Sequence, residues 1–105
     1  MNSHRKALEH AKKAIYECSF DIVRQDRKLE NKETNAKKAT TLAIAYHNLG
    51  VEEEFCGNLE AAKLAYFKAF EMLERINGPN DQLVEKFKQT YLEAKEVFFN
   101  FNLSS

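Results

Sequence analysis

The histidines, cysteines and clustered glutamates of this chain are the side chains that could do chemistry. A His–Cys pair could activate a thiolate nucleophile, and grouped carboxylates could bind a hard cation. His47 and Cys56, however, are nine residues apart on one expected helix, which separates them by about 13 Å along its axis. Glu52, Glu53 and Glu54 follow one another directly, so a helix points them about 100° apart and they do not converge on one ion. We therefore expect a solvated acidic face, with no catalytic site and no metal site.

Other enzyme motifs are also missing from the sequence. The three glycines do not form a phosphate-binding loop, and there is no His-Glu-x-x-His or Cys-x-x-Cys motif. His4 and His10 are six residues apart, whereas two histidines of one helix share a metal at i, i+4 spacing. We predict that the chain is not an enzyme and uses no cofactor.

Composition narrows the classes of partner and the compartment. The 105 residues suffice for one domain, and 16 basic against 16 acidic residues leave no net charge, which argues against binding to nucleic acid or an anionic membrane. No run of eighteen apolar residues is present, and the first residues lack the apolar core of a secretory signal. Cys18 and Cys56 each lie in an apolar stripe, so we interpret them as small buried residues of a cytoplasmic protein.

The elements that would position any site are helices, because Ala, Leu, Glu and Lys dominate and only one proline interrupts them. Apolar residues recur at intervals of three and four, which predicts four helices, at 3–30, 36–56, 59–76 and 80–100. Ser3, Asn58 and Asn80 or Asp81 are the expected N-caps. Gly57 and Gly78 are expected in the left-handed conformation at the ends of the second and third helices. The predicted fold class is all-α, built from antiparallel helix hairpins in a single domain over 1–105.

One hairpin has a specific pattern of large and small residues. The large positions surround small ones, where two helix backbones must approach closely. The pattern comprises Tyr46, Leu49, Gly50, Leu59, Ala62, Tyr66, Ala69 and Phe70. It resembles one tetratricopeptide repeat (TPR), a helix–turn–helix unit of about 34 residues. The resemblance implies a right-handed superhelical fragment of four helices in which Gly50 packs against Ala62 and the function is protein interaction.

The match to the repeat departs in two places. Glu53 stands where an aromatic residue is usual, and the expected proline arrives late, at Pro79. The longer linker is similar to that of kinesin-light-chain-type repeats. Ala7, Ala11 and Ala14 repeat the offsets of Ala62, Tyr66 and Ala69, so the first helix resembles the second helix of a preceding repeat. The fourth helix, with Tyr91 or Leu92 at the position of the small residue, is interpreted as a terminal capping helix.

The resemblance places the binding surface on the concave side of the second helix. The residues expected there, as contacts of a peptide segment or partner protein, are Ile44, His47, Asn48, Val51, Glu54 and Phe55. Asn48 precedes Leu-Gly at a position where the family often uses an asparagine to hydrogen-bond a bound peptide backbone, since an amide offers both donor and acceptor. Lys and Arg are missing from this surface, so recognition of a terminal carboxylate is not expected.

The sequence leaves two alternatives open. The stripe from Leu8 through Ile15 and Ile22 to Leu29 outruns the third helix, which we expect to cover it, and phenylalanines crowd the chain end. Such excess apolar surface predicts a homodimer, or a fragment of a longer repeat array. The other alternative is a helical bundle unrelated to TPRs, in which Gly50 and Ala62 do not face each other.

Overall fold

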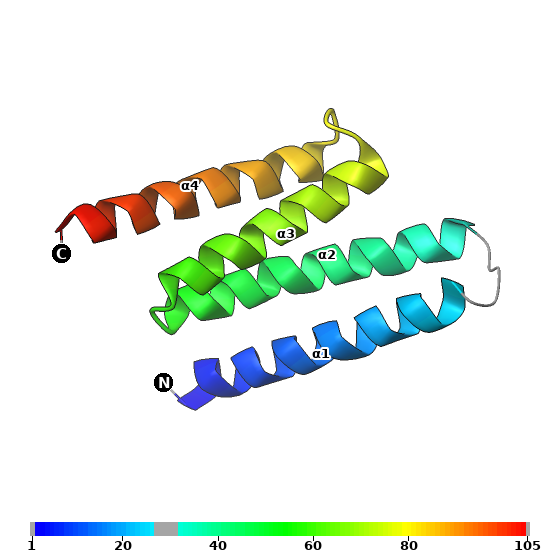
Figure 1. Cartoon of the computed structure of the whole chain (residues 1–105), viewed down its shortest axis with the longest axis horizontal. Helices are drawn as coiled ribbons and strands as arrows, with labels where there is room; N and C mark the ends of the chain where they lie inside the picture. Colours follow the sequence, from blue (N-terminus) through cyan, green and yellow to red (C-terminus); the bar gives the residue numbers. More distant parts are fainter. Residues whose placement is uncertain (1, 27–31, 105) are drawn as a thin grey trace.

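Four helices follow one another and run in alternating directions (Figure 1). The computed structural model describes the backbone of residues 2–26 and 32–104, and the side chains of residues 3, 5–16 and 36–103. The helices are α1 (Asn2–Asp26), α2 (Lys32–Phe55), α3 (Leu59–Asn77) and α4 (Gln82–Ser104). Each helix packs against the next in sequence, and no strand occurs in the described part of the backbone. The prediction of an all-α fold made of antiparallel hairpins is confirmed.

The helix bounds agree best where turn residues interrupt the chain. Around Gly57 and Gly78 the observed and predicted bounds differ by at most two residues. Elsewhere the helices extend further than predicted. Helix α2 begins at Lys32 rather than at 36, and α4 continues to Ser104 rather than ending at 100, because no glycine or proline stops either one. The predicted end of the first helix, at 27–30, lies outside the described residues.

The core lies where α2, α3 and α4 meet. One buried cluster contains Ala43, Ala69, Leu73, Val84 and Phe87, and a second contains Ala62, Tyr66 and Ala94. The three-and-four spacing of the apolar residues predicts an inward stripe on the third helix, Ala62, Tyr66, Ala69 and Leu73, and these residues are buried. The corresponding stripe of the fourth helix is also confirmed, because Val84, Phe87 and Ala94 are buried and Tyr91 and Phe98 are half-buried.

Gly50 is buried where α2 faces α3. A Cβ atom added at Gly50 would lie 2.5 Å from Cε1 and 2.6 Å from Cδ1 of Tyr66. The nearest neighbour is therefore the ring of Tyr66, whereas the sequence pointed to Ala62. The prediction of a small residue at this contact is confirmed, because the Tyr66 ring occupies the space that a side chain at position 50 would need. The packing of Gly50 against Ala62 itself stays a prediction.

The two turns use similar residues differently. Gly57 and Gly78 have positive φ, +82° and +85°, as expected, but the ψ of Gly78 is 166°, so its backbone is not in the left-handed helical region. Asp81 caps α4, because its Oδ2 accepts hydrogen bonds from the N–H groups of Leu83 and Val84 at 3.1 and 3.2 Å. Asn58 occupies the expected N-cap position of α3, but its side chain makes no cap hydrogen bond.

Asn58 instead serves Glu53. Its Nδ2 donates to Oε1 of Glu53 at 3.1 Å, and Glu53 is only 6% exposed. The expectation of a uniformly solvated acidic face was therefore wrong at this position. A buried carboxylate needs a hydrogen-bond donor, and the amide across the turn supplies one.

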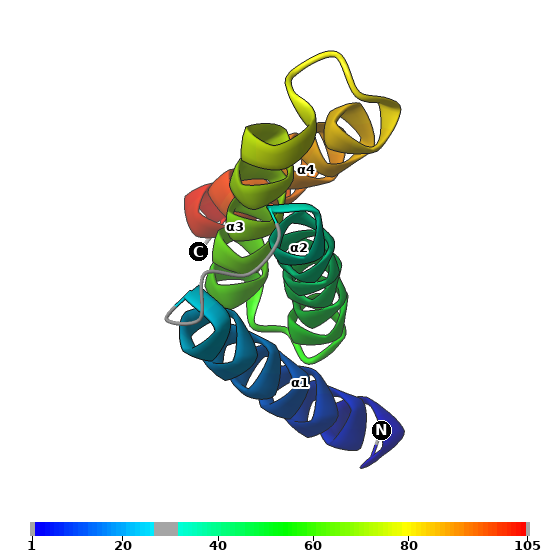
Figure 2. The same ribbon diagram turned by 90° about the vertical axis from the view of Figure 1, so that its right-hand side faces the viewer.

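Helix α1 packs against α2, whereas the third helix was expected to cover its stripe. Leu8 and Ile15 are buried. The side chains of Cys18, Ile22 and Leu29, from the same stripe, lie outside the described ones. Helices α1 and α4 lie on opposite sides of α2 (Figure 2). Cys56 is a free, exposed thiol rather than a buried residue, because it directly follows the last residue of α2.

Candidate functional site

The predicted binding surface of α2 faces outward over most of its length. Ile44, Asn48, Glu54 and Phe55 are exposed, with 40% of the surface of Ile44 and 66% of that of Phe55 accessible. Val51 is half-buried and packs against the cluster of Ala62, Tyr66 and Ala94. The predicted residues thus lie on one helix between α1 and α4, and four of them are exposed.

The first hollow beside this surface lies between α1 and α2. It has a volume of about 540 Å³. Its α2 wall contains Asn48, Val51 and Glu52, and its α1 wall contains His10 and the small residues Ala7, Ala11 and Ala14. Because alanine side chains are short, they leave room beside the amide of Asn48.

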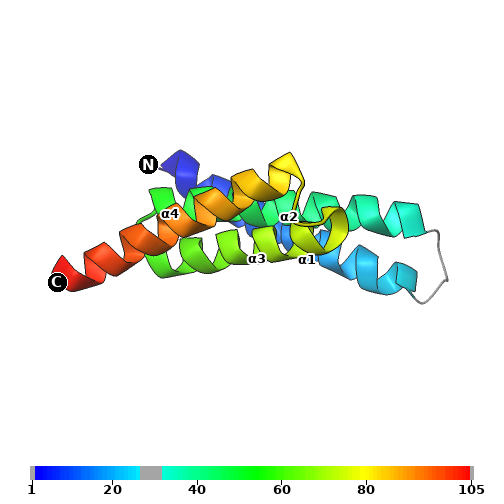
Figure 3. The ribbon, with the colours of Figure 1, turned by 90° about the horizontal axis from the view of Figure 1, so that it is seen from above.

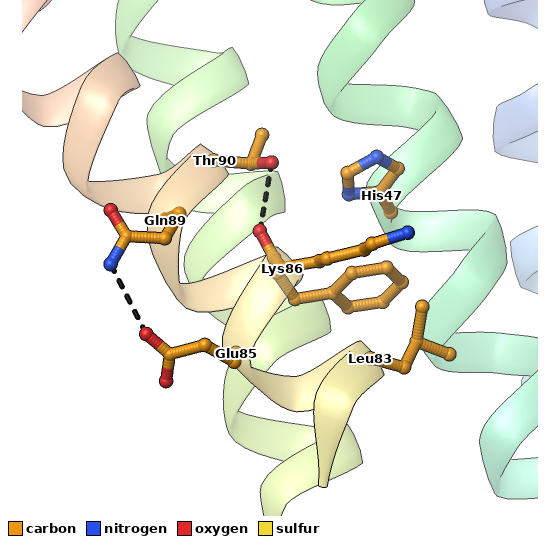
Figure 4. A pocket seen from close by; sticks show the side chains of 7 residues that line it. His47, Leu83, Glu85, Lys86, Gln89 and Thr90 are labelled. Atoms are coloured by element: carbon orange, nitrogen blue, oxygen red, sulfur yellow. Dashed lines mark hydrogen bonds between the residues drawn. The ribbon is translucent and has the colours of Figure 1, made fainter.

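The second hollow, of about 430 Å³, lies between α2 and α4 and contains His47 (Figure 4). The side chain of Lys86 extends from α4 toward α2, and Thr90 donates to the backbone oxygen of Lys86 at 3.0 Å. The imidazole ring of His47 stacks on Phe87, with ring centroids 4.4 Å apart and the planes 9° from parallel. It also contacts Tyr66 at 5.4 Å in a tilted arrangement.

His47 is therefore a packing residue as well as a surface residue. It is half-buried, and its Nδ1 atom is buried with no hydrogen-bond partner among the described residues. Burial lowers the pKa of His47 below its usual 6.5, because the charged imidazolium loses solvation. His47 was expected on the binding surface of α2, but Phe87 of α4 covers part of its ring.

Glu54 is exposed and also accepts a hydrogen bond from a buried residue of α3. The hydroxyl of Tyr66, a residue that is only 2% exposed, donates to Oε1 of Glu54 at 2.8 Å. Burial raises the pKa of the Tyr66 phenol, and the hydrogen bond and the charge of Glu54 raise it further. The hydroxyl is thus a fixed donor that holds this carboxylate at the edge of the surface.

This arrangement suits recognition more than reaction. The exposed groups are apolar side chains, one amide and one carboxylate, with Lys86 on the neighbouring wall. Among the described residues, no three His, Cys, Asp or Glu side chains are grouped so that they could hold a metal ion. In the same part of the chain, no helix is both long enough and apolar enough to span a membrane.

Sequence reasoning missed the two walls of the surface. The alanines of α1 were noted only for their spacing, and Phe87 was not among the predicted site residues. The alanine spacing was a usable signal, because small residues at helical intervals leave a shallow groove. Nothing in the sequence indicates that Phe87 covers His47.

No protein-family model matches the chain, and neither a curated protein nor a solved structure matches it.

Proposed function

We propose that this chain is a TPR-like protein-interaction module that binds a peptide segment along α2, between α1 and α4. One observation carries the proposal: α2 presents Ile44, Asn48 and Phe55 outward, and a hollow lies on each of its flanks. A helix that packs against other helices on two sides and still exposes large apolar side chains offers an apolar surface to which a ligand can bind.

Asn48 is the polar anchor of this proposal. Its side chain is exposed and lines the hollow beside α1, so a peptide lying there meets one donor and one acceptor. Ile44 and Phe55 flank it along the helix and supply apolar contacts. An extended segment with free backbone amides and a few apolar side chains fits this set.

Selection of a phage-displayed random peptide library on the whole chain tests the proposal. Peptides recovered from it should lose affinity up to about tenfold when Asn48 is replaced by alanine, since a net hydrogen bond contributes about 1 kcal/mol. The melting temperature should stay unchanged, because an exposed amide contributes little to folding.

Two matched variants control the experiment. Asn80→Ala removes an exposed asparagine from the α3–α4 turn, and Leu64→Ala removes an exposed apolar side chain, 57% accessible, from α3. Both should bind the selected peptides like the parent chain, whereas Phe55→Ala should weaken them. Peptides that bind Asn48→Ala and Phe55→Ala as tightly as the parent would overturn the proposal.

The proposed module is non-enzymatic and cytoplasmic. An exposed unpaired thiol at Cys56 supports a reducing compartment, where free cysteines persist. The partner is a protein or peptide, with no role proposed for nucleic acid, membrane or cofactor.

A further inference from the structure

Helix α4 carries a second apolar stripe on the side away from the core. Leu92, Phe99 and Leu103 are seven and four residues apart, so they share one face of the helix. They are 41%, 60% and 70% exposed, respectively. The inward stripe through Ala94 lies on the other side, where α3 covers it. We name Leu92, Glu96, Phe99 and Leu103 the outer α4 stripe.

The end of α4 leaves this stripe open to a partner. Helix α4 runs past the beginning of α3, so its last turns project beyond the neighbouring helix (Figure 3). A hollow of about 400 Å³ adjoins the stripe and is lined by Leu92, Phe98, Phe99 and the stems of Lys63 and Lys95. Lys63 places its Nζ 4.3 Å from the ring centre of Phe98, which holds the base of the hollow against α3.

We infer that the outer α4 stripe binds the same stripe of a second copy, with the two α4 helices antiparallel about a two-fold axis. The charges on the stripe select this occupant. Lys95 and Glu96 are adjacent and both line the hollow. A two-fold axis between them sets Lys95 of each copy opposite Glu96 of the other, so one surface is complementary to itself.

The same register matches the apolar residues. When Lys95 is opposite Glu96 in an antiparallel pair, Leu92 is opposite Phe99, and each pairing occurs twice. Leu103 then lies over the alkyl stem of Lys88, whose ammonium group can remain in water. The chain has no net charge, so two copies approach without overall repulsion.

Sedimentation of the whole chain at high micromolar concentration tests this dimer. The parent should sediment as a dimer and Phe99→Glu as a monomer with unchanged helix content. Leu64→Glu, an equally drastic change on the exposed side of α3, should leave the dimer intact. A monomeric parent, or a Phe99→Glu variant that still forms the dimer, overturns the inference.

A charge swap tests the register. Lys95→Glu or Glu96→Lys alone turns two attractive pairs into repulsive ones, which should weaken the dimer about tenfold. The double variant Lys95→Glu/Glu96→Lys should restore the parent's affinity. If it does not, the antiparallel register is wrong. These substitutions are on α4 and Asn48 is on α2, so they should not change the binding of the selected peptides. A failure of the dimer therefore leaves the proposed function separately testable.

Discussion

The two hairpins that share α3 are held together in different ways. In the α2–α3 hairpin the helices meet at a glycine, and polar bonds link Tyr66 to Glu54 and Asn58 to Glu53. In the α3–α4 hairpin aromatic rings make the contacts. Tyr91 packs against Phe67 and Phe70, with ring centroids 5.1 and 6.5 Å apart.

This difference indicates which of the two hairpins tolerates substitutions with a smaller loss of stability. Where a glycine lets two helices pack closely, any larger side chain collides with the opposite helix, because protein interiors are already densely packed. A contact made by several rings can adjust by small rotations of each. We therefore expect substitutions in the first hairpin to cost more than matched substitutions in the second.

The largest effect is expected at Gly50. In Gly50→Leu, the new side chain collides with the Tyr66 ring, and overpacking of this kind costs roughly 3 kcal/mol, more than the helix propensity gained. Chemical denaturation should measure this loss. In a Tyr66→Ala background, Gly50→Ala should instead be stabilising, since the ring is gone and only the propensity remains. A Gly50→Leu variant as stable as the parent would remove the distinction between the hairpins.

The next effect concerns the turn of each hairpin. Asn58→Asp replaces the donor to Glu53 with a carboxylate, which should cost about 2 kcal/mol because a buried acceptor loses its partner and gains a like charge. The reverse exchange in the second turn, Asp81→Asn, should be nearly neutral, because both residues cap a helix well. If Asn58→Asp stabilised the chain, residue 58 would contribute through capping of α3 and not through its hydrogen bond to Glu53.

A smaller effect is expected from removing one hydroxyl group in each hairpin. Tyr66→Phe loses the hydrogen bond to Glu54 and should lower stability by about 1 kcal/mol. Tyr91→Phe should change nothing measurable, because within the described residues the Tyr91 hydroxyl has no hydrogen-bond partner and its ring contacts remain. Equal losses in both variants would show that the hairpins do not differ in this respect.

Much of the fold could be predicted from sequence because it depends on periodicity and on turn residues. The spacing of Ala62, Tyr66, Ala69 and Leu73 predicted the buried face of α3, and Gly57 predicted a turn with positive φ. The packing of α1 against α2 could not be predicted from residue spacing, because periodicity identifies the buried face of a helix but not the helix that covers it.

The candidate site was predicted less well for a similar reason. The resemblance implied an outward-facing surface with Ile44, Asn48 and Phe55, and these three side chains are exposed. The partners of Glu53, Glu54 and His47, however, come from α3, α4 or the turn, and the spacing along α2 alone carries no information about them. Side-chain contacts between helices were the part that required the structure.

The smallest effect is expected at His47, which joins the two hairpins by stacking on Phe87. Because burial lowers its pKa in the folded chain, the unfolded chain takes up a proton first as the pH falls. The stability contributed by the neutral ring is complete above the unfolded value of about 6.5 and is lost progressively as the pH falls below it.

Melting curves of the parent and of His47→Phe, compared between about pH 7.5 and about pH 5.5, measure this contribution. The parent should lose more stability than the variant over this interval, because the two chains differ in ionisable groups only at position 47. Glu85, which lines the same hollow, provides the alternative. If that carboxylate stabilised the imidazolium, the parent would gain stability relative to His47→Phe on acidification, and His47 would bind α4 through charge rather than through its stacked neutral ring.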